Sequence, residues 1–176
     1  MNRLEMSKFI QSLDAYEASR VLKGLLDENP DLLEKAYDCA VKVAADIDVD
    51  GISDGVFTYL SMLDIDDLNR RAGSTQYGYV SPDEAAWELF EEVLAPFVGD
   101  ITKNRERGLP AAAKACCLGI IKGIRMYDEE PSSDFGGWAE DLTGEHIDTV
   151  VKEWKKGNPS SEDIDEVMRA AEGNPS

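Results

Sequence analysis

Apolar residues recur along most of this chain at three- and four-residue steps, with charged residues between them. That spacing is the period of an amphipathic α-helix, and we find no convincing run of alternating apolar and polar residues of the kind that marks a half-buried strand. We therefore predict an all-α fold of about eight helices, stacked as antiparallel helical hairpins in a compact or slightly superhelical array.

The best-marked helix start lies in residues 73–98, GSTQYGYVSPDEAAWELFEEVLAPFV. Ser81 and Glu84 are spaced as a capping box, and a proline occupies the first helical position between them. Apolar residues then follow at helical spacing, while the glutamates fall largely outside that stripe. Pro96 lacks the amide hydrogen that would bond the carbonyl of Glu92, so we expect a kink or a break in the helix there.

The turn before this helix is rich in glycine and tyrosine. We interpret it as a tight turn between helices whose glycines take positive φ, with a ligand-binding loop as the alternative. Aromatic and arginine side chains dominate interface energies, so this turn and its neighbours form the surface on which we expect a partner to bind. The residues of this predicted surface are Arg70, Arg71, Tyr77, Tyr79 and Trp87.

The N-terminal residues 1–45 are predicted to form helical hairpins. After a short first helix, Asp14 and Glu17 are spaced to cap a second one. Pro30 follows the end of that helix and suits the first position of a third. Two antiparallel helices joined by a short turn are the expected result.

The remaining chain divides by composition. Capped helices are predicted over 46–128, a loop rich in Pro, Ser and Gly over 129–141, and an amphipathic helix over 142–157. Residues 1–157 would thus form one helical domain. A last helix and tail, 158–176, either attach loosely to it or dock on a partner.

Small side chains line one face of the helix predicted after Pro110. That face is expected to let a neighbouring helix backbone come unusually close, and two aromatic residues of the following loop are expected to enter the core. The small residues are Ala112, Cys116, Gly119 and Gly123, and the two aromatic residues are Phe135 and Trp138.

An acidic segment, DIDVDGISDG, opens like the calcium-binding loop of an EF-hand. Its twelfth position holds Phe57 where a bidentate glutamate belongs, so only weak, water-completed binding of a divalent cation is expected. The other interpretation is that the aspartates cap the next helix and interact with its dipole. The candidate ligands are Asp46, Asp48, Asp50 and Asp54.

The net charge is −18, from 18 Lys and Arg against 36 Asp and Glu. Phosphate backbones are bound by cationic side chains, so direct binding of nucleic acid is disfavoured. Such a charge keeps a protein soluble. It also leaves open an acidic mimic of nucleic acid that binds a basic protein with steep salt dependence.

The sequence contains few of the residues and motifs that are typical of catalytic sites. The single histidine, His146, lies in the first turn of a helix that we expect to be exposed, and one histidine with three poorly spaced cysteines cannot form a common zinc site. No phosphate-binding glycine loop or nucleophile elbow occurs. We expect no cofactor, and a small-molecule enzyme remains only as the residual possibility.

The N-terminal MNRLEMSKFIQSLD lacks the apolar centre and cleavage site of a signal peptide, and no apolar run is long enough to cross a bilayer. The odd number of cysteines does not suit a disulfide framework. We therefore expect a cytoplasmic protein that does not enter the membrane.

The run DVDGISDGVFTYLSMLDIDDLNRRAGSTQYGYVSPDEAAWELFEEVLAPF, with LPAAAKACCLGIIKGI and FGGWAED after it, resembles the helical region that accompanies SWIM-type zinc fingers in uncharacterised bacterial and archaeal proteins. The resemblance extends from near Asp48 to near Trp138, and GSTQYGYVSPDEAAWE is its most specific part. The finger's own CxC and CxH ligands are absent here, so zinc binding is not implied.

Taken with the helical pattern, these features predict a protein-interaction or scaffold module that binds a protein partner. The alternatives are the acidic mimic of nucleic acid and a weak divalent-cation-binding domain. The identity of the partner and the oligomeric state are left open by the sequence.

Overall fold

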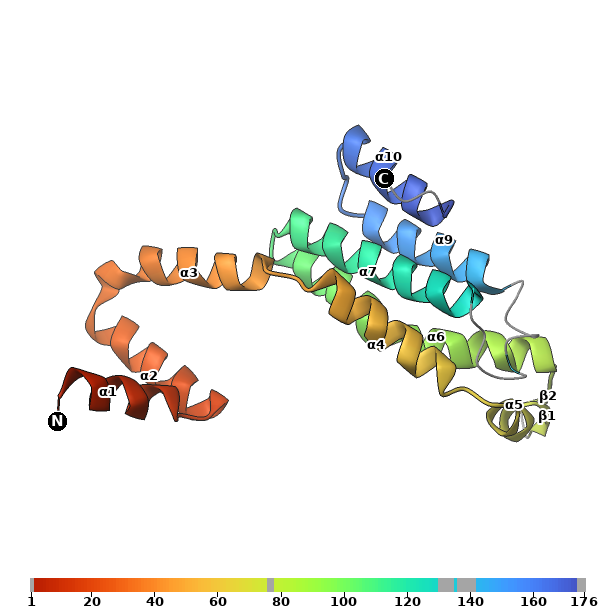
Figure 1. The fold of residues 1–176 in the computed structure, drawn as a ribbon, viewed down its shortest axis with the longest axis horizontal. Helices are drawn as coiled ribbons and strands as arrows, with labels where there is room; N and C mark the ends of the chain where they lie inside the picture. Colours follow the sequence, from red (N-terminus) through yellow and green to blue (C-terminus); the bar gives the residue numbers. More distant parts are fainter. Residues whose placement is uncertain (1, 76–77, 130–134, 136–141, 174–176) are drawn as a thin grey trace. The chain divides into compact units, whose positions relative to one another are not determined.

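The computed structural model describes residues 2–75, 78–129, 135 and 142–173 (Figure 1). Its internal contacts divide the chain into two units, unit 1 (Met1–Val43) and unit 2 (Ala44–Ser176), which we describe separately. Nearly all regular structure in the described residues is helical, so the predicted all-α fold is confirmed. The sequence pattern had suggested one domain over 1–157, whereas the contacts separate the first 43 residues.

Unit 1 contains two α-helices, a short 3-10 turn and most of a third helix. These are α1 (Arg3–Gln11), α2 (Ala15–Glu28), the 3-10 turn (Pro30–Leu32) and α3 (Leu33–Ala45). The predicted cap of α2 is present: the Glu17 amide donates to Asp14 Oδ1 at 2.8 Å, and the Asp14 amide donates to the Glu17 carboxylate at 3.1 Å. Local capping therefore sets where α2 begins.

The predicted hairpin of α2 and α3 does not form. The two helices do not lie side by side (Figure 1), and none of residues 2–43 is buried. An apolar stripe shows that a helix face is suited to burial, but it does not say which surface buries it. Within unit 1 the stripes are covered only in part, because Leu26 and Leu32 are partly buried and none of its described residues is fully buried.

Unit 2 is organised around one long helix. Its elements are α4 (Val49–Ser61), α5 (Ile65–Arg71), β1 (Gly73–Thr75), β2 (Gly78–Val80), α6 (Pro82–Glu106), α7 (Pro110–Glu129), α9 (Leu142–Lys155) and α10 (Ser161–Ala171). Helix α7 contacts α4, α6, α9 and α10, and in Figure 1 it lies between α9 and the pair α4 and α6. It is consequently buried on more than one side.

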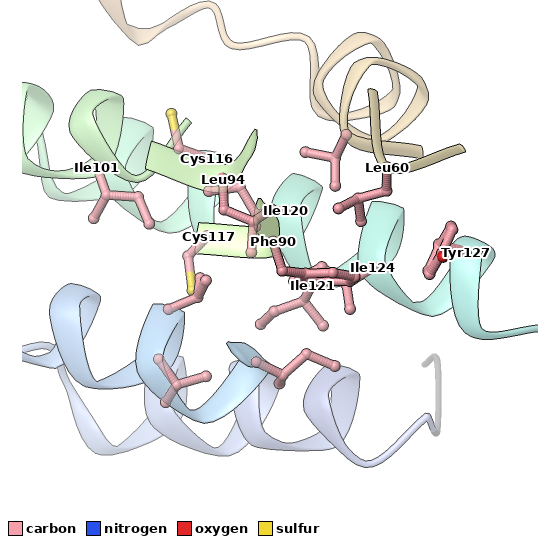
Figure 2. Close-up of a cluster of buried hydrophobic side chains, with 14 of the residues drawn as sticks. Leu60, Phe90, Leu94, Ile101, Cys116, Cys117, Ile120, Ile121, Ile124 and Tyr127 are labelled. Carbon is pink, nitrogen blue, oxygen red and sulfur yellow. The ribbon is translucent and has the colours of Figure 1, made fainter. Parts of the chain in front are cut away.

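The core of unit 2 is built from aliphatic and aromatic side chains of these helices. Figure 2 shows labelled side chains of α4, α6 and α7 gathered in one cluster. Phe135 is fully buried in the same core, as predicted, while Trp138 lies outside the described residues. Fully buried members include Val56, Leu60, Phe90, Ile101, Cys117, Ile120, Ile124 and Val167.

The small-residue face of α7 packs against α4, which confirms the predicted close approach. A Cβ added at Gly123 would stand 2.6 Å from the Ser53 carbonyl oxygen and 2.6 Å from Val56 Cβ. A Cβ added at Gly119 would stand 2.8 Å from Ile52 Cβ. Real Cβ atoms do not approach other atoms so closely, so glycine at these positions is what lets the two helices meet.

Helix α6 runs without a break from Pro82 to Glu106, so the predicted break at Pro96 is wrong. Its start agrees with the sequence, because the Glu84 amide donates to Ser81 Oγ at 3.2 Å. Buried side chains on both sides of Pro96, Leu94 and Ile101, anchor the two halves in one core. That packing offsets the backbone hydrogen bond that proline removes.

A short antiparallel ribbon replaces the simple turn expected before α6. Strands β1 and β2 pair in the register Gly73 with Val80 and Thr75 with Gly78. Gly73 and Gly78 take φ of 117° and 140°, which confirms the expected positive φ of the glycines. Three-residue strands are too short to show an alternating pattern, so they could not be predicted from the apolar periodicity.

The C-terminal helix is docked within unit 2. Helix α10 packs on α7 and α9 and buries Val167, and Lys114 Nζ of α7 donates to Asp163 at 2.7 Å and to Glu166 at 2.9 Å. These hydrogen bonds raise the pKa of Lys114. The alternative of a loosely attached final helix is therefore wrong.

Among the residues that the structure describes, no helix is long and apolar enough to cross a membrane.

Candidate functional site

The two arginines of the predicted surface are engaged within the chain. Arg71 Nη2 lies 2.9 Å from each carboxylate oxygen of Glu92, and Arg71 Nη1 lies 3.6 Å from Glu88. Because both glutamates are on α6, Arg71 fastens the end of α5 to that helix. Arg70 pairs with Asp67 on its own helix.

The aromatic residues of the predicted surface have different environments. Tyr79, on β2, is 70% exposed, whereas Trp87 on α6 is half-buried. Tyr77 lies outside the described residues. Arg71 thus contacts α6, the helix that carries Trp87. Tyr79 is the exposed aromatic side chain in the described part of this surface.

Trp87 packs on the single histidine. The Trp87 and His146 ring centroids are 4.1 Å apart, and the two ring planes meet at 80°. The ring of Phe90 also contacts His146, with a centroid distance of 4.9 Å. His146 is only 3% exposed, so the expectation of an exposed position is wrong. Polar character in the sequence did not reveal the burial, which comes from α9 packing against α6.

Burial determines the protonation of this histidine. It lowers the pKa of His146 to about 4, because a charged imidazolium would lose its hydration there. Neither ring nitrogen has a hydrogen-bond partner among the described residues, and both are sealed from solvent. His146 is therefore a neutral, almost fully buried residue at pH 7, and with Trp87 it forms part of the wall of a cavity between α6 and α9.

A cavity of about 380 Å³ lies beside this aromatic cluster. Its walls are largely apolar, with Leu94 and Val98 of α6 facing Val150 of α9, and its rim carries the carboxylates of Glu91 and Glu153. The carboxylate of Glu153 already accepts hydrogen bonds from Lys156, Arg105 and Thr102, and these bonds lower its pKa. The cavity is therefore concave and mainly apolar, but it does not present a group of unpaired polar side chains that would select one kind of ligand.

The acidic segment behaves as a helix start. Asp48 caps α4, since its Oδ1 accepts from the Gly51 amide at 2.9 Å, and helix begins at Val49. Lys122 Nζ donates to Asp50 at 2.6 Å and lowers the pKa of that carboxyl. Across the described ranges no group of three His, Cys, Asp or Glu side chains is placed to hold a metal ion.

The four aspartates therefore serve different positions instead of converging. Asp46 precedes the helix, Asp48 is its cap, Asp50 pairs with α7, and Asp54 lies exposed on the second turn. A calcium loop of this type surrounds its ion with oxygens from successive alternate residues, whereas a helix spreads such residues around its axis. The capping interpretation of Asp48 is the one that the hydrogen bond supports.

The cysteines fall into two classes. Cys116 and Cys117 of α7 are buried, and burial raises the pKa of both thiols, that of Cys117 to about 12. Asn104 Nδ2 lies 3.5 Å from Cys116 Sγ. Neither thiol is poised as a thiolate nucleophile. Cys39 of α3 is exposed.

Exposed large apolar side chains are concentrated in a part of the chain that is not predicted as a binding surface from the sequence. Of the 15 large apolar side chains that are exposed in the described residues, 11 belong to unit 1. We call these 11 the unit 1 apolar surface: Leu4, Met6, Phe9, Ile10, Tyr16, Val21, Leu22, Leu25, Leu33, Tyr37 and Val43. The sequence carries a signal for it, because apolar residues of α2 such as Val21, Leu22 and Leu25 recur at helical spacing.

The predicted surface at the ribbon can be tested separately. We expect Tyr79→Ala to change the free energy of unfolding by no more than about 0.5 kcal/mol, because Tyr79 is exposed. Urea titration followed by tryptophan fluorescence measures this. Arg71→Ala serves as a comparison and should cost up to about 1 kcal/mol, since it removes the partly exposed ion pairs with α6. A large loss of stability in Tyr79→Ala would show that the tyrosine is a packing residue.

Comparison with known proteins found no matching protein family, no matching curated protein and no matching solved structure. The resemblance to the helical region beside SWIM-type zinc fingers therefore stays a prediction from the sequence.

Proposed function

We propose that the protein is a protein-interaction module and that the unit 1 apolar surface binds the partner. One observation carries this proposal: helices α1, α2 and α3 are well capped or amphipathic, yet none of the described residues of unit 1 is buried. Unit 2, by contrast, has a complete core. A surface of this kind on an otherwise well-packed protein is typical of a binding site.

The energetic argument concerns α2. Val21, Leu22 and Leu25 repeat at helical spacing, and each remains about half exposed in the folded unit. Covering the exposed part of three such side chains contributes on the order of 3 kcal/mol. A segment of 43 residues that forgoes this burial is too small to support a stable fold of its own. Association with another protein surface supplies the missing burial.

The chemistry of the surface defines the class of partner. Its side chains are aliphatic and aromatic and lie on helices, so the complementary surface is an apolar helical face or groove of another protein. Nucleic acid is a poor match, because binding it requires clustered cations. Unit 1 has only six Lys and Arg against eight Asp and Glu.

We expect Leu22→Asp to abolish partner capture while Ser19→Asp leaves it unchanged. Both variants add one negative charge to the exposed surface of α2, but only Leu22 belongs to the unit 1 apolar surface. Tagged full-length chains are used to capture proteins from host extract at moderate salt, and the amount of each bound protein, including untagged copies of this chain, is quantified.

Equal far-UV circular dichroism of the two variants provides the control for helix content. A set of captured proteins that is the same for wild type, Ser19→Asp and Leu22→Asp would contradict the proposed surface. The ribbon variant Tyr77→Ala with Tyr79→Ala, run in parallel, reports whether residues 70–79 contribute instead.

A further inference from the structure

We propose that the partner of the unit 1 apolar surface is the same surface of a second copy of this chain, so that the protein is a dimer joined through unit 1. This inference rests on the proposed function and specifies its partner. It follows from three properties of unit 1: its charge, the size of its exposed apolar surface and the uniform chemistry of that surface.

Charge makes unit 1 the one part of the chain where two copies can meet without strong repulsion. Its net charge is −2, whereas unit 2, with 12 Lys and Arg against 28 Asp and Glu, has a net charge of −16. Surfaces of high like charge repel each other and hold molecules apart. Two copies that approach through unit 2 would meet this repulsion, and two that approach through unit 1 would largely avoid it.

The exposed area is of the size that a stable interface uses. Phe9, Tyr16 and Tyr37 are 62–71% exposed, and rings that each bury about 150–250 Å² when covered offer roughly 300–500 Å² in this state. With the eight exposed aliphatic and Met side chains, the apolar area exposed on α1, α2 and α3 together reaches the order of 800 Å². That is the share of each partner in a standard interface when one contact covers all three helices.

The chemistry of the surface is self-complementary. A symmetric dimer places the same patch of both subunits together, which requires a patch that matches itself. The α2 stripe meets this requirement, because Val21, Leu22 and Leu25 are aliphatic and Ala18 lies beside them at the same helical spacing. Aliphatic surfaces have no charge pattern that self-pairing would violate. A two-fold contact also closes on itself, so the expected assembly is a dimer and not a polymer.

The experiment compares the full chain with Leu22→Asp and Ser19→Asp by size-exclusion chromatography with multi-angle light scattering over a range of concentrations. We expect wild type and Ser19→Asp to have twice the 19.4 kDa mass of the chain. Leu22→Asp should raise the dissociation constant about thirtyfold or more, as a charge placed in the centre of an apolar interface does.

A second measurement locates the interface. Cys39 is the exposed thiol and lies in unit 1, while Cys116 and Cys117 are buried, so a spin label attached to the native chain reports on unit 1. Pulsed dipolar spectroscopy should detect two interacting spins per particle in wild type and Ser19→Asp, and isolated spins in Leu22→Asp at the same concentration.

The outcomes separate this inference from the function on which it rests. A monomer that still captures another protein in a manner sensitive to Leu22→Asp would overturn the dimer and retain the interaction module. A dimer that Leu22→Asp leaves intact would overturn the assignment of the interface to unit 1. A monomer that captures no protein would overturn both.

Discussion

Replacing Gly123 by alanine is expected to lower the free energy of unfolding of unit 2 by up to about 2 kcal/mol, from an overpacking cost of about 1–3 kcal/mol. The new methyl group would stand 2.6 Å from both the Ser53 carbonyl oxygen and Val56 Cβ. Relieving these contacts requires α4 and α7 to separate along their shared face. Alanine favours helix over glycine by about 1 kcal/mol, so the expected loss is what remains after that gain.

The matched control is Gly99→Ala in α6. Gly99 is also inside a helix, but an added Cβ there meets nothing within 4 Å, so this variant should be more stable than wild type by up to about 1 kcal/mol. Urea unfolding followed by tryptophan fluorescence measures both, because the three tryptophans fall in unit 2. The opposite signs are the test: equal stabilisation in Gly123→Ala and Gly99→Ala would mean that α4 and α7 are not in close contact.

Acid is expected to destabilise unit 2 through His146. Its pKa is about 4 in the folded protein and 6.5 when unfolded. Between these values the unfolded state binds the proton and the folded state does not, so stability falls as pH decreases from 6.5 towards 4. For these two pKa values the loss attributable to His146 is about 2 kcal/mol at pH 5 relative to pH 7.

The variant His146→Phe isolates this contribution. Phenylalanine occupies a similar volume between Trp87 and Phe90 and does not titrate, while every carboxylate of the chain remains. The difference in unfolding free energy between wild type and His146→Phe should therefore change by about 2 kcal/mol between pH 7 and pH 5. A difference that is constant over this range would show that His146 is accessible to protons in the folded state.

The features that sequence reasoning predicted well depend on neighbours along the chain. Asp14, Asp48 and Ser81 cap the helices that follow them, because a cap is a hydrogen bond to an amide three residues away. The helix class was predictable for the same reason, since the apolar period is local. The close approach at Gly123 was also foreseen, because only small side chains line that face of α7.

The features that were missed depend on partners distant in sequence. The sequence predicts an antiparallel pair for α2 and α3, but an apolar stripe gives no information about the surface that covers it. His146 was expected to be exposed because its own neighbours are polar, yet α6 covers it. A break at Pro96 is one of the two outcomes that the sequence predicts, whereas core packing of Leu94 and Ile101 keeps the helix continuous. In each case tertiary packing outweighed the local signal.

The candidate site illustrates the same limit. Residues 70–87 are predicted to bind a partner because their residue types are frequent at interfaces. In the structure, however, Arg71 forms an ion pair with Glu92 and Trp87 packs on His146. The unit 1 apolar surface is not predicted as a binding surface, because leucine and valine at helical spacing normally form a core. Only the absence of burial in residues 2–43 distinguishes that surface from ordinary packing.

The different burial of the three thiols allows local unfolding of unit 2 to be measured from their rates of alkylation. Alkylation requires an accessible thiolate, so Cys39 should react at a rate close to that of a free thiol. Cys116 and Cys117 can react only during the moments when α7 leaves the core. The ratio of the two rates in one unmodified sample therefore measures how often the centre of unit 2 opens under native conditions, without denaturant or mutation.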